Sequence, residues 1–94
     1  MVNNKVSKEK LEKYFDLTGR ALEIVKDKII LGREEDSKEI IEMVSNYLSD
    51  AKHFEGRGNW VLAFGALNYA HGWLDAGVRL GVFDVDDDSL FTVK

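Results

Sequence analysis

The chain lacks both cysteine and proline, and it has no excess of basic residues. Without cysteine it can form no disulfide framework, thiolate metal site or cysteine nucleophile. Because the chain has no proline, no segment contains the residue that most strongly interrupts a helix. The 13 Lys and Arg residues are outnumbered by 17 Asp and Glu, and the net charge is −4. This balance disfavours a nucleic-acid surface.

Signals for export or for membrane insertion are also missing. The first ten residues, MVNNKVSKEK, contain no apolar stretch of signal-peptide length. The apolar segment 60–81 is long enough to cross a bilayer, but it carries Asn68, His71, Asp75 and Arg79, which would be costly there. We therefore expect a cytoplasmic protein without a membrane span, and the absence of cysteine agrees with a reducing compartment.

Three long segments show the three-four spacing of apolar residues that is typical of amphipathic helices. We predict helices over about 7–31, 36–55 and 59–81, followed by an acidic tail over 82–94. The connections between the helices are short, so neighbouring helices should run antiparallel. The expected fold is all-α, a three-helix up-down-up antiparallel bundle with a short C-terminal extension, in which residues 1–94 form one domain.

Several residues are expected to set the ends of these helices. Ser7 has the side chain of an N-cap for the first helix. Asp36 and Glu39 have the spacing of a capping box for the second. At the end of the third, Gly81 and Val82 suit a Schellman motif, in which a glycine of left-handed conformation is followed by an apolar contact.

One face of the third predicted helix carries a polar stripe. At about 100° per residue, Asp75 and Arg79 fall within about 20° of Asn68, and His71 lies about 60° to one side. Three interpretations of the stripe are open. It could face solvent, it could be partly buried and bonded to the other helices, or it could form a ligand or catalytic site.

The opposite half of this helix is apolar. It holds Leu62, Ala63, Ala66, Leu67, Tyr69, Ala70, Trp73, Leu74, Gly77 and Leu80. We expect this arc to be the packing centre of the bundle, and Gly65, Gly72 and Gly77 to serve close packing or a partner. Val61 and Phe64 continue the polar face toward the helix start, and their exposure would create an apolar patch suited to a partner.

The chain also carries a family resemblance. The stretches concerned are KYFDLTGRALEIVK, SNYLSDAKHFEGRGNWVLAFGALNYAHGWLDAG and VRLGVFDV. Together they resemble the archaeal family catalogued as domain of unknown function 357, over roughly Leu11 to Val85. NYAHGWLDAGVRLGVF is the most specific part. The resemblance implies an archaeal source, a three-helix bundle and no assigned biochemical activity, and it supplies no catalytic residues.

No catalytic residue, metal site or cofactor is predicted. His53 would lie about 18 Å from His71 along the bundle axis, too far for the two to share one ion. The sequence favours a non-enzymatic module that acts by protein–protein contact, with a protein partner or as a homo-oligomer. The alternative is a small-ligand-binding protein or enzyme that uses the polar stripe, and it requires a pocket beside those four residues.

Overall fold

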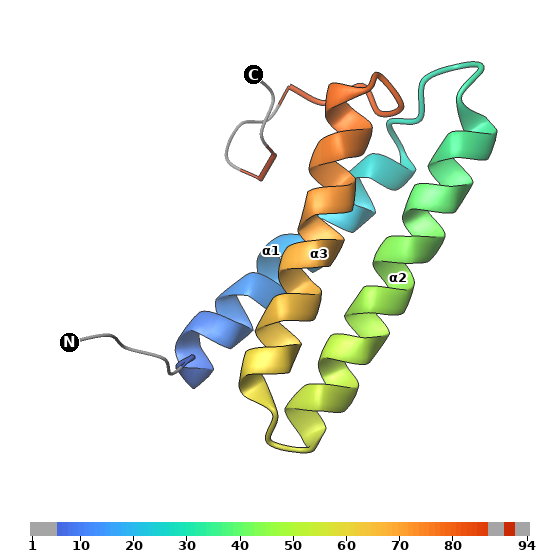
Figure 1. The fold of residues 1–94 in the computed structure, drawn as a ribbon. Coiled ribbons are helices and arrows are strands. Elements are labelled where there is room, and N and C mark those ends of the chain that lie inside the picture. The colour runs from blue at the N-terminus through green and yellow to red at the C-terminus, as the bar shows by residue number, and fades with distance from the viewer. Residues whose placement is uncertain (1–5, 87–89, 92–94) are drawn as a thin grey trace.

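The computed structural model describes residues 6–86 and 90–91, and these form three helices. Helix α1 spans Lys8–Lys26, α2 spans Glu34–Gly56 and α3 spans Trp60–Arg79. They run up, down and up, and a short segment follows α3 (Figure 1). The prediction of an all-α three-helix bundle is therefore confirmed.

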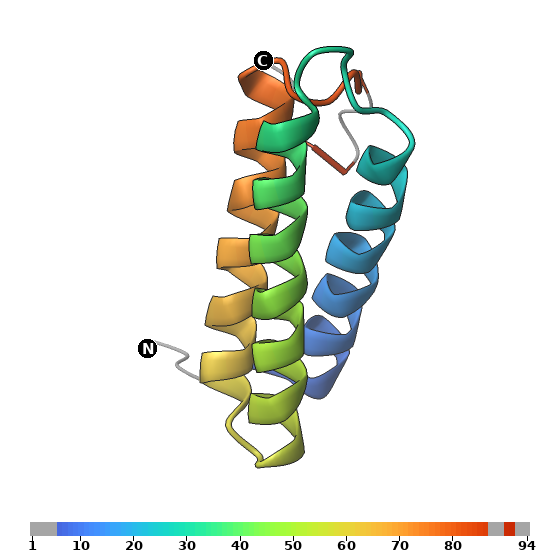
Figure 2. The ribbon, with the colours of Figure 1, turned by 90° about the vertical axis from the view of Figure 1, so that its right-hand side faces the viewer.

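The three helices do not contact one another equally. α2 and α3 pack along their whole lengths, whereas α1 rests mainly on α3 and meets α2 much less. Figure 2 shows the upper part of α1 standing apart from α2, and Leu90 and Phe91 belong to the buried cluster that α1 and α3 share there. The segment that follows α3 therefore contributes to the docking of α1.

The core falls into two clusters, one at each end of the bundle. The upper cluster, beside the α1–α2 loop, consists of Ala21, Leu22, Val25, Ile40, Val44, Ala70, Leu74, Val82, Phe83, Leu90 and Phe91. The lower cluster, beside the α2–α3 loop, consists of Leu11, Ala51, Ala63, Ala66 and Leu67. Tyr47 and Leu48 are half-buried and pack against both clusters.

Two of the predicted helix ends are confirmed by hydrogen bonds. The hydroxyl of Ser7 accepts from the backbone N–H of Lys10 at 3.1 Å, as an N-cap does. After α3, Gly81 has φ +76°, and the N–H of Val82 donates to the carbonyl of Gly77 at 2.8 Å. This is the six-to-one bond of a Schellman motif, and it turns the chain back over the bundle.

Helix α1 ends at Lys26, so the predicted end at Leu31 is wrong. The reason is a competing partner for the backbone of residues 28–30. Ile29 forms an antiparallel bridge with Phe83, and the N–H of Ile30 donates to the carbonyl of Val82 at 2.9 Å. Two adjacent β-branched residues suit this extended pairing better than a helix.

Helix α2 begins at Glu34, two residues before the predicted start, and the expected Asp36–Glu39 capping box does not cap it. The carboxylate of Glu34 instead accepts from the N–H of Gly32 at 2.9 Å. Asp36 accepts from Nε of Arg33 at 3.1 Å, while Nη1 of Arg33 donates to the carbonyl of Leu80 at 3.0 Å. Arg33 thus joins the start of α2 to the last turn of α3, where a cation is favoured.

Gly77 allows the segment after α3 to lie directly on that helix. A Cβ at this position would lie 2.5 Å from Cε2 of Phe83 and 3.1 Å from Cδ1 of Ile40. Phe83 is 2 % exposed and closes the upper end of the core. Close packing therefore accounts for Gly77.

Candidate functional site

The polar stripe of α3 is divided by the fold. His71 and Asp75 are half-buried, whereas Asn68 and Arg79 are exposed. Three of the four line a hollow of about 250 Å³ between α1 and α3, which is lined by Tyr14, Leu17, Asn68, His71, Gly72, Asp75 and Leu90. Arg79 is not part of this lining. The hollow therefore holds only part of the predicted set.

His71 is bonded on both ring nitrogens. Its Nε2 lies 2.6 Å from the carbonyl oxygen of Leu90, and its Nδ1 lies 3.2 Å from the hydroxyl of Thr18. A carbonyl oxygen only accepts, so Nε2 carries a proton and donates it. In the neutral ring, Nδ1 then accepts from Thr18, a side chain that is fully buried. His71 thus joins α1, α3 and the segment after α3.

These bonds limit the chemistry available in the hollow. A histidine acts as a base or a metal ligand through a free nitrogen lone pair, and neither nitrogen of His71 offers one here. Oδ1 of Asp75 lies 4.0 Å from Nε2 of His71. Among the described residues, no three His, Cys, Asp or Glu side chains are grouped closely enough to hold a metal ion.

We expected the whole apolar arc of α3 to be buried in the core, and this is wrong for the residues along one side of the arc. Ala63, Ala66, Leu67, Ala70, Leu74 and Gly77 are buried, but Leu62, Tyr69, Trp73 and Leu80 are exposed. The exposed fractions are 50 % for Leu62, 67 % for Tyr69, 38 % for Trp73 and 68 % for Leu80. Two neighbouring helices cover only part of the circumference of α3, and its apolar arc is wider than that part.

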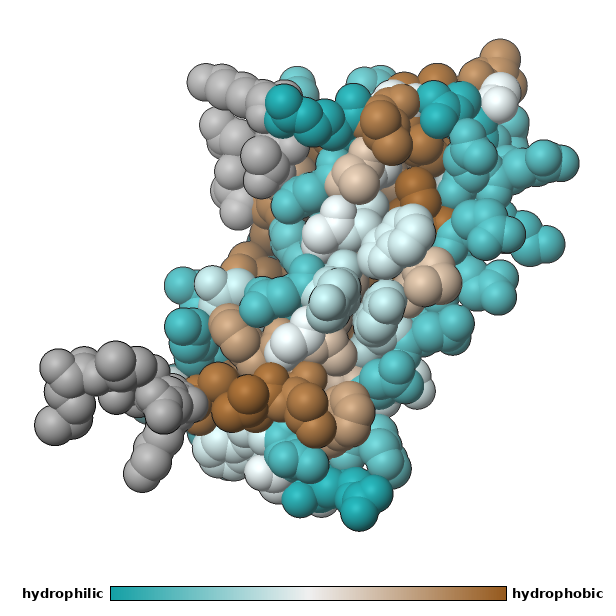
Figure 3. Space-filling model, in the orientation of Figure 1, coloured by the Kyte–Doolittle hydropathy of each residue, from teal (hydrophilic) through white to brown (hydrophobic). Residues whose placement is uncertain are grey.

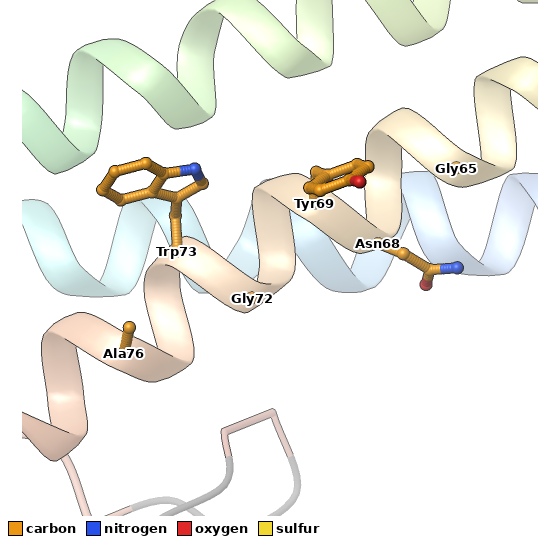
Figure 4. A pocket seen from close by; sticks show the side chains of 6 residues that line it. All are labelled: Gly65, Asn68, Tyr69, Gly72, Trp73 and Ala76. Carbon is orange, nitrogen blue, oxygen red and sulfur yellow. The ribbon is translucent and has the colours of Figure 1, made fainter.

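Most of the exposed residues of α3, with the half-buried Gly65, form a continuous surface along the helix, which we call its outer face; the exposed Arg79 lies at its edge. The outer face consists of Val61, Leu62, Gly65, Asn68, Tyr69, Gly72, Trp73, Ala76 and Leu80. A groove of about 650 Å³ runs along its centre. Tyr69 and Trp73 project on one side of this groove and Asn68 on the other (Figure 4). A Cβ at Gly65 or Gly72 would meet nothing within 4 Å, so packing within the chain does not account for these two glycines.

Aromatic contacts hold the groove wall in place. The ring of Tyr69 stacks on that of Tyr47 from α2, with centroids 5.6 Å apart and planes 16° apart. Figure 3 shows the outer face as a pale to brown band along α3, bordered by hydrophilic surface. The band is thus an apolar strip within a charged molecular surface.

The two candidate partner-contact residues have different surroundings. Val61 is 61 % exposed and belongs to the outer face. Phe64 is half-buried against α1, where its ring meets Tyr14 edge to face at 5.0 Å and lies under Nζ of Lys10. A role for either in binding stays a prediction, and the position of Val61 suits that role better.

Sequence reasoning missed most of the outer face, and it missed the hydrogen bond by which Arg33 joins the start of α2 to the end of α3. One signal for the face is present in the sequence. More than half of the circumference of α3 is apolar, which exceeds what two neighbouring helices can cover, and Gly65 and Gly72 interrupt its other half. For Arg33, no signal links it to Leu80, because the contact arises only when the chain folds.

The fold and this surface define a small helical bundle with an apolar face on its third helix. Residues 13–83 match the family model described as protein of unknown function (DUF357), and the chain belongs to this family. No curated protein and no solved structure matches the chain. Across the described ranges, no helix is long and apolar enough to traverse a lipid bilayer.

Proposed function

We propose that this chain is a non-enzymatic helical module that binds protein through the outer face of α3. The observation that carries the proposal is the exposure of Val61, Leu62, Tyr69, Trp73 and Leu80 along one helix. An apolar strip of this kind, bordered by charged residues, is typical of protein interaction sites. Tyr and Trp are among the residues most enriched at such sites.

The shape of the outer face supports an elongated, helical partner. The groove is lined by residues of α3 alone, at spacings of three and four, and is open along the helix. Amphipathic helices bind such surfaces through anchors at the same spacing. Gly65 and Gly72 let a second helix backbone approach closely, while Tyr69 and Trp73 offer it a rigid aromatic wall.

The alternative function, ligand binding at the polar stripe, has the hollow between α1 and α3 in its favour. At about 250 Å³ the hollow lies below the roughly 300–1,000 Å³ of small-molecule sites. Both ring nitrogens of His71 are engaged, and Arg79 is outside the lining. We therefore favour the outer face. The cytoplasmic location and the archaeal source stay predictions.

Site-specific photo-crosslinking in cells tests the proposal. A photoreactive phenylalanine in place of Tyr69 should give discrete protein adducts, because that side chain is 67 % exposed at the centre of the face. The same group in place of Ser45, which is exposed on α2, is the matched control and should give few. Equal adduct patterns at the two positions, or none at Tyr69, would contradict the proposed function.

A further inference from the structure

We propose that the partner on the outer face of α3 is a second copy of this chain, with the two α3 helices antiparallel. The proposal rests on the proposed function and names the partner. It is carried by the exposed apolar surface of the face, by the near absence of charge on it, and by the order of large and small residues along it.

The exposed surface is large enough for a specific dimer. With about 150–250 Å² for a large side chain, the exposed fractions of Val61, Leu62, Tyr69, Trp73 and Leu80 leave roughly 430–710 Å² open. Two copies would thus cover roughly 850–1,400 Å², before the smaller residues of the face are counted. A specific interface buries at least about 1,000 Å² in total.

The distribution of charge favours a copy of the same face over another surface of the molecule. None of the nine residues of the outer face is Asp, Glu, Lys, Arg or His, although the exposed Arg79 lies at its edge, at the same helical angle as Val61. By contrast, the exposed residues of α1 and α2 include many Lys, Glu and Asp, such as Lys13, Glu23, Glu42 and Lys52. Placing those charges against Tyr69 and Trp73 would strip them of water without pairing them, which is costly. The outer face of a second copy brings only Arg79, at the edge of the contact, where a long side chain can keep its guanidinium in water.

The order of side chains along α3 makes the face complementary to itself when it is reversed. A two-fold axis at the level between Ala70 and His71 places Tyr69 opposite Gly72 of the second copy, and this contact occurs twice. At the same register Gly65 lies opposite Ala76 of the second copy, and Val61 lies opposite Leu80. Tyr69 thus meets a small residue near the centre and Val61 an aliphatic one at the end. Trp73 lies opposite Asn68, and Leu62 lies opposite Arg79 at the edge of the contact.

A parallel pairing lacks this match. Each residue would then lie beside its own copy, so Tyr69 would meet Tyr69 and Gly72 would meet Gly72. The rings would hold the helices apart at one level and leave a gap at the next. Gaps of this kind forfeit packing contacts, so the antiparallel arrangement is favoured.

Sedimentation equilibrium of the full chain tests the self-association. The mass should rise from 10.7 kDa toward twice that value with concentration. Tyr69→Lys should raise the dimer dissociation constant at least about tenfold, because it places a charge at the centre of the interface. Leu31→Lys is the matched control: Leu31 is 93 % exposed but lies in the α1–α2 loop, so the dissociation constant should not change.

Cysteine pairing tests the direction of the helices, and the chain has no cysteine of its own to interfere. Variants Gly65→Cys and Ala76→Cys should cross-link to each other on oxidation when they are mixed. Each alone should cross-link poorly, because copies of one position lie about 16 Å apart along the axis, well beyond the roughly 7 Å that a disulfide spans. Efficient cross-linking of each variant with itself would overturn the antiparallel arrangement.

The two proposals fail in different ways. If the chain stays at 10.7 kDa at high concentration while Tyr69 cross-links to a different protein, the dimer proposal is wrong and the proposed binding function stands. If Tyr69 gives no adduct in cells, the binding function itself is wrong. Circular dichroism of Tyr69→Lys checks that the variant keeps its helices, which is expected because this side chain is exposed.

Discussion

Two polar side chains, Arg33 and His71, tie together parts of the chain that are far apart in sequence. Arg33 donates to the carbonyls of Leu80 and Gly81 at the end of α3. His71 donates to the carbonyl of Leu90 and is bonded to Thr18 in α1. Each bond is worth only about 0.5–1.5 kcal/mol net, but loss of a donor leaves a partly buried carbonyl without its partner. A polar residue on a helix face can thus have a structural role, by hydrogen-bonding segments that are distant in sequence.

Replacement of His71 tests this structural role. His71→Ala should lower the free energy of unfolding by about 1–3 kcal/mol, because it leaves the carbonyl of Leu90 and the buried hydroxyl of Thr18 without a partner. Urea denaturation measures the change. His53→Ala is the matched control, since His53 is exposed near the end of α2, and it should stay within about 0.5 kcal/mol. Equal effects of the two substitutions would show that the hydrogen bonds of His71 do not stabilise the fold.

At the scale of elements, the segment after α3 determines where α1 ends. Residues 82–84 pair with residues 28–30 and stop α1 at Lys26. The same segment puts Phe83 against Gly77 of α3. One short irregular stretch therefore sets the end of the first helix and fills the top of the core.

The contact between Gly77 and Phe83 can be tested with a pair of glycine substitutions. Gly77→Ala should destabilise the fold by about 1–3 kcal/mol, because the new methyl group would overlap the ring of Phe83. Gly19→Ala is the control in α1, where a Cβ meets nothing within 4 Å, and it should stabilise by up to about 1 kcal/mol through helix propensity. Thermal unfolding should separate the two variants, and a Gly77→Ala chain as stable as the parent would contradict this packing.

The elements differ in how far the sequence predicts them. The three helices follow from their apolar spacing, and Ser7 and Gly81 mark two ends by local chemistry. The end of α1 does not follow, because Ile29 keeps the helical spacing and its competing partner, Phe83, comes far later in the chain. For the candidate site, the spacing places the polar stripe on one face, but the exposure of Tyr69 depends on which arc the neighbouring helices cover.

At the scale of the whole molecule, the core is divided along the bundle. Leu11 belongs to the lower cluster and Val44 to the upper one, and both side chains are fully buried. The clusters are linked by the half-buried Tyr47 and Leu48. Residues in different clusters should therefore contribute to stability almost independently.

A double-mutant cycle tests this independence. The destabilisations of Leu11→Val and Val44→Ala should add within about 0.5 kcal/mol, since the two residues share no cluster. The matched pair Val44→Ala and Leu74→Val lies within the upper cluster and should deviate from additivity by more than that. The free energies come from urea denaturation of the single and double variants. Strong coupling between the clusters, equal to that within one, would mean that the core acts as a single unit.

The sparse contact between α1 and α2 has a consequence for how the protein is made. Leu90 and Phe91 belong to the same buried cluster as Ala21 and Val25 of α1, yet they leave the ribosome after all three helices. The α2–α3 hairpin can form as soon as it emerges, because its contacts are close in sequence. α1, although synthesised first, gains its full set of contacts only when these later residues arrive. We therefore expect α1 to be secured after the α2–α3 hairpin, although it is synthesised before it.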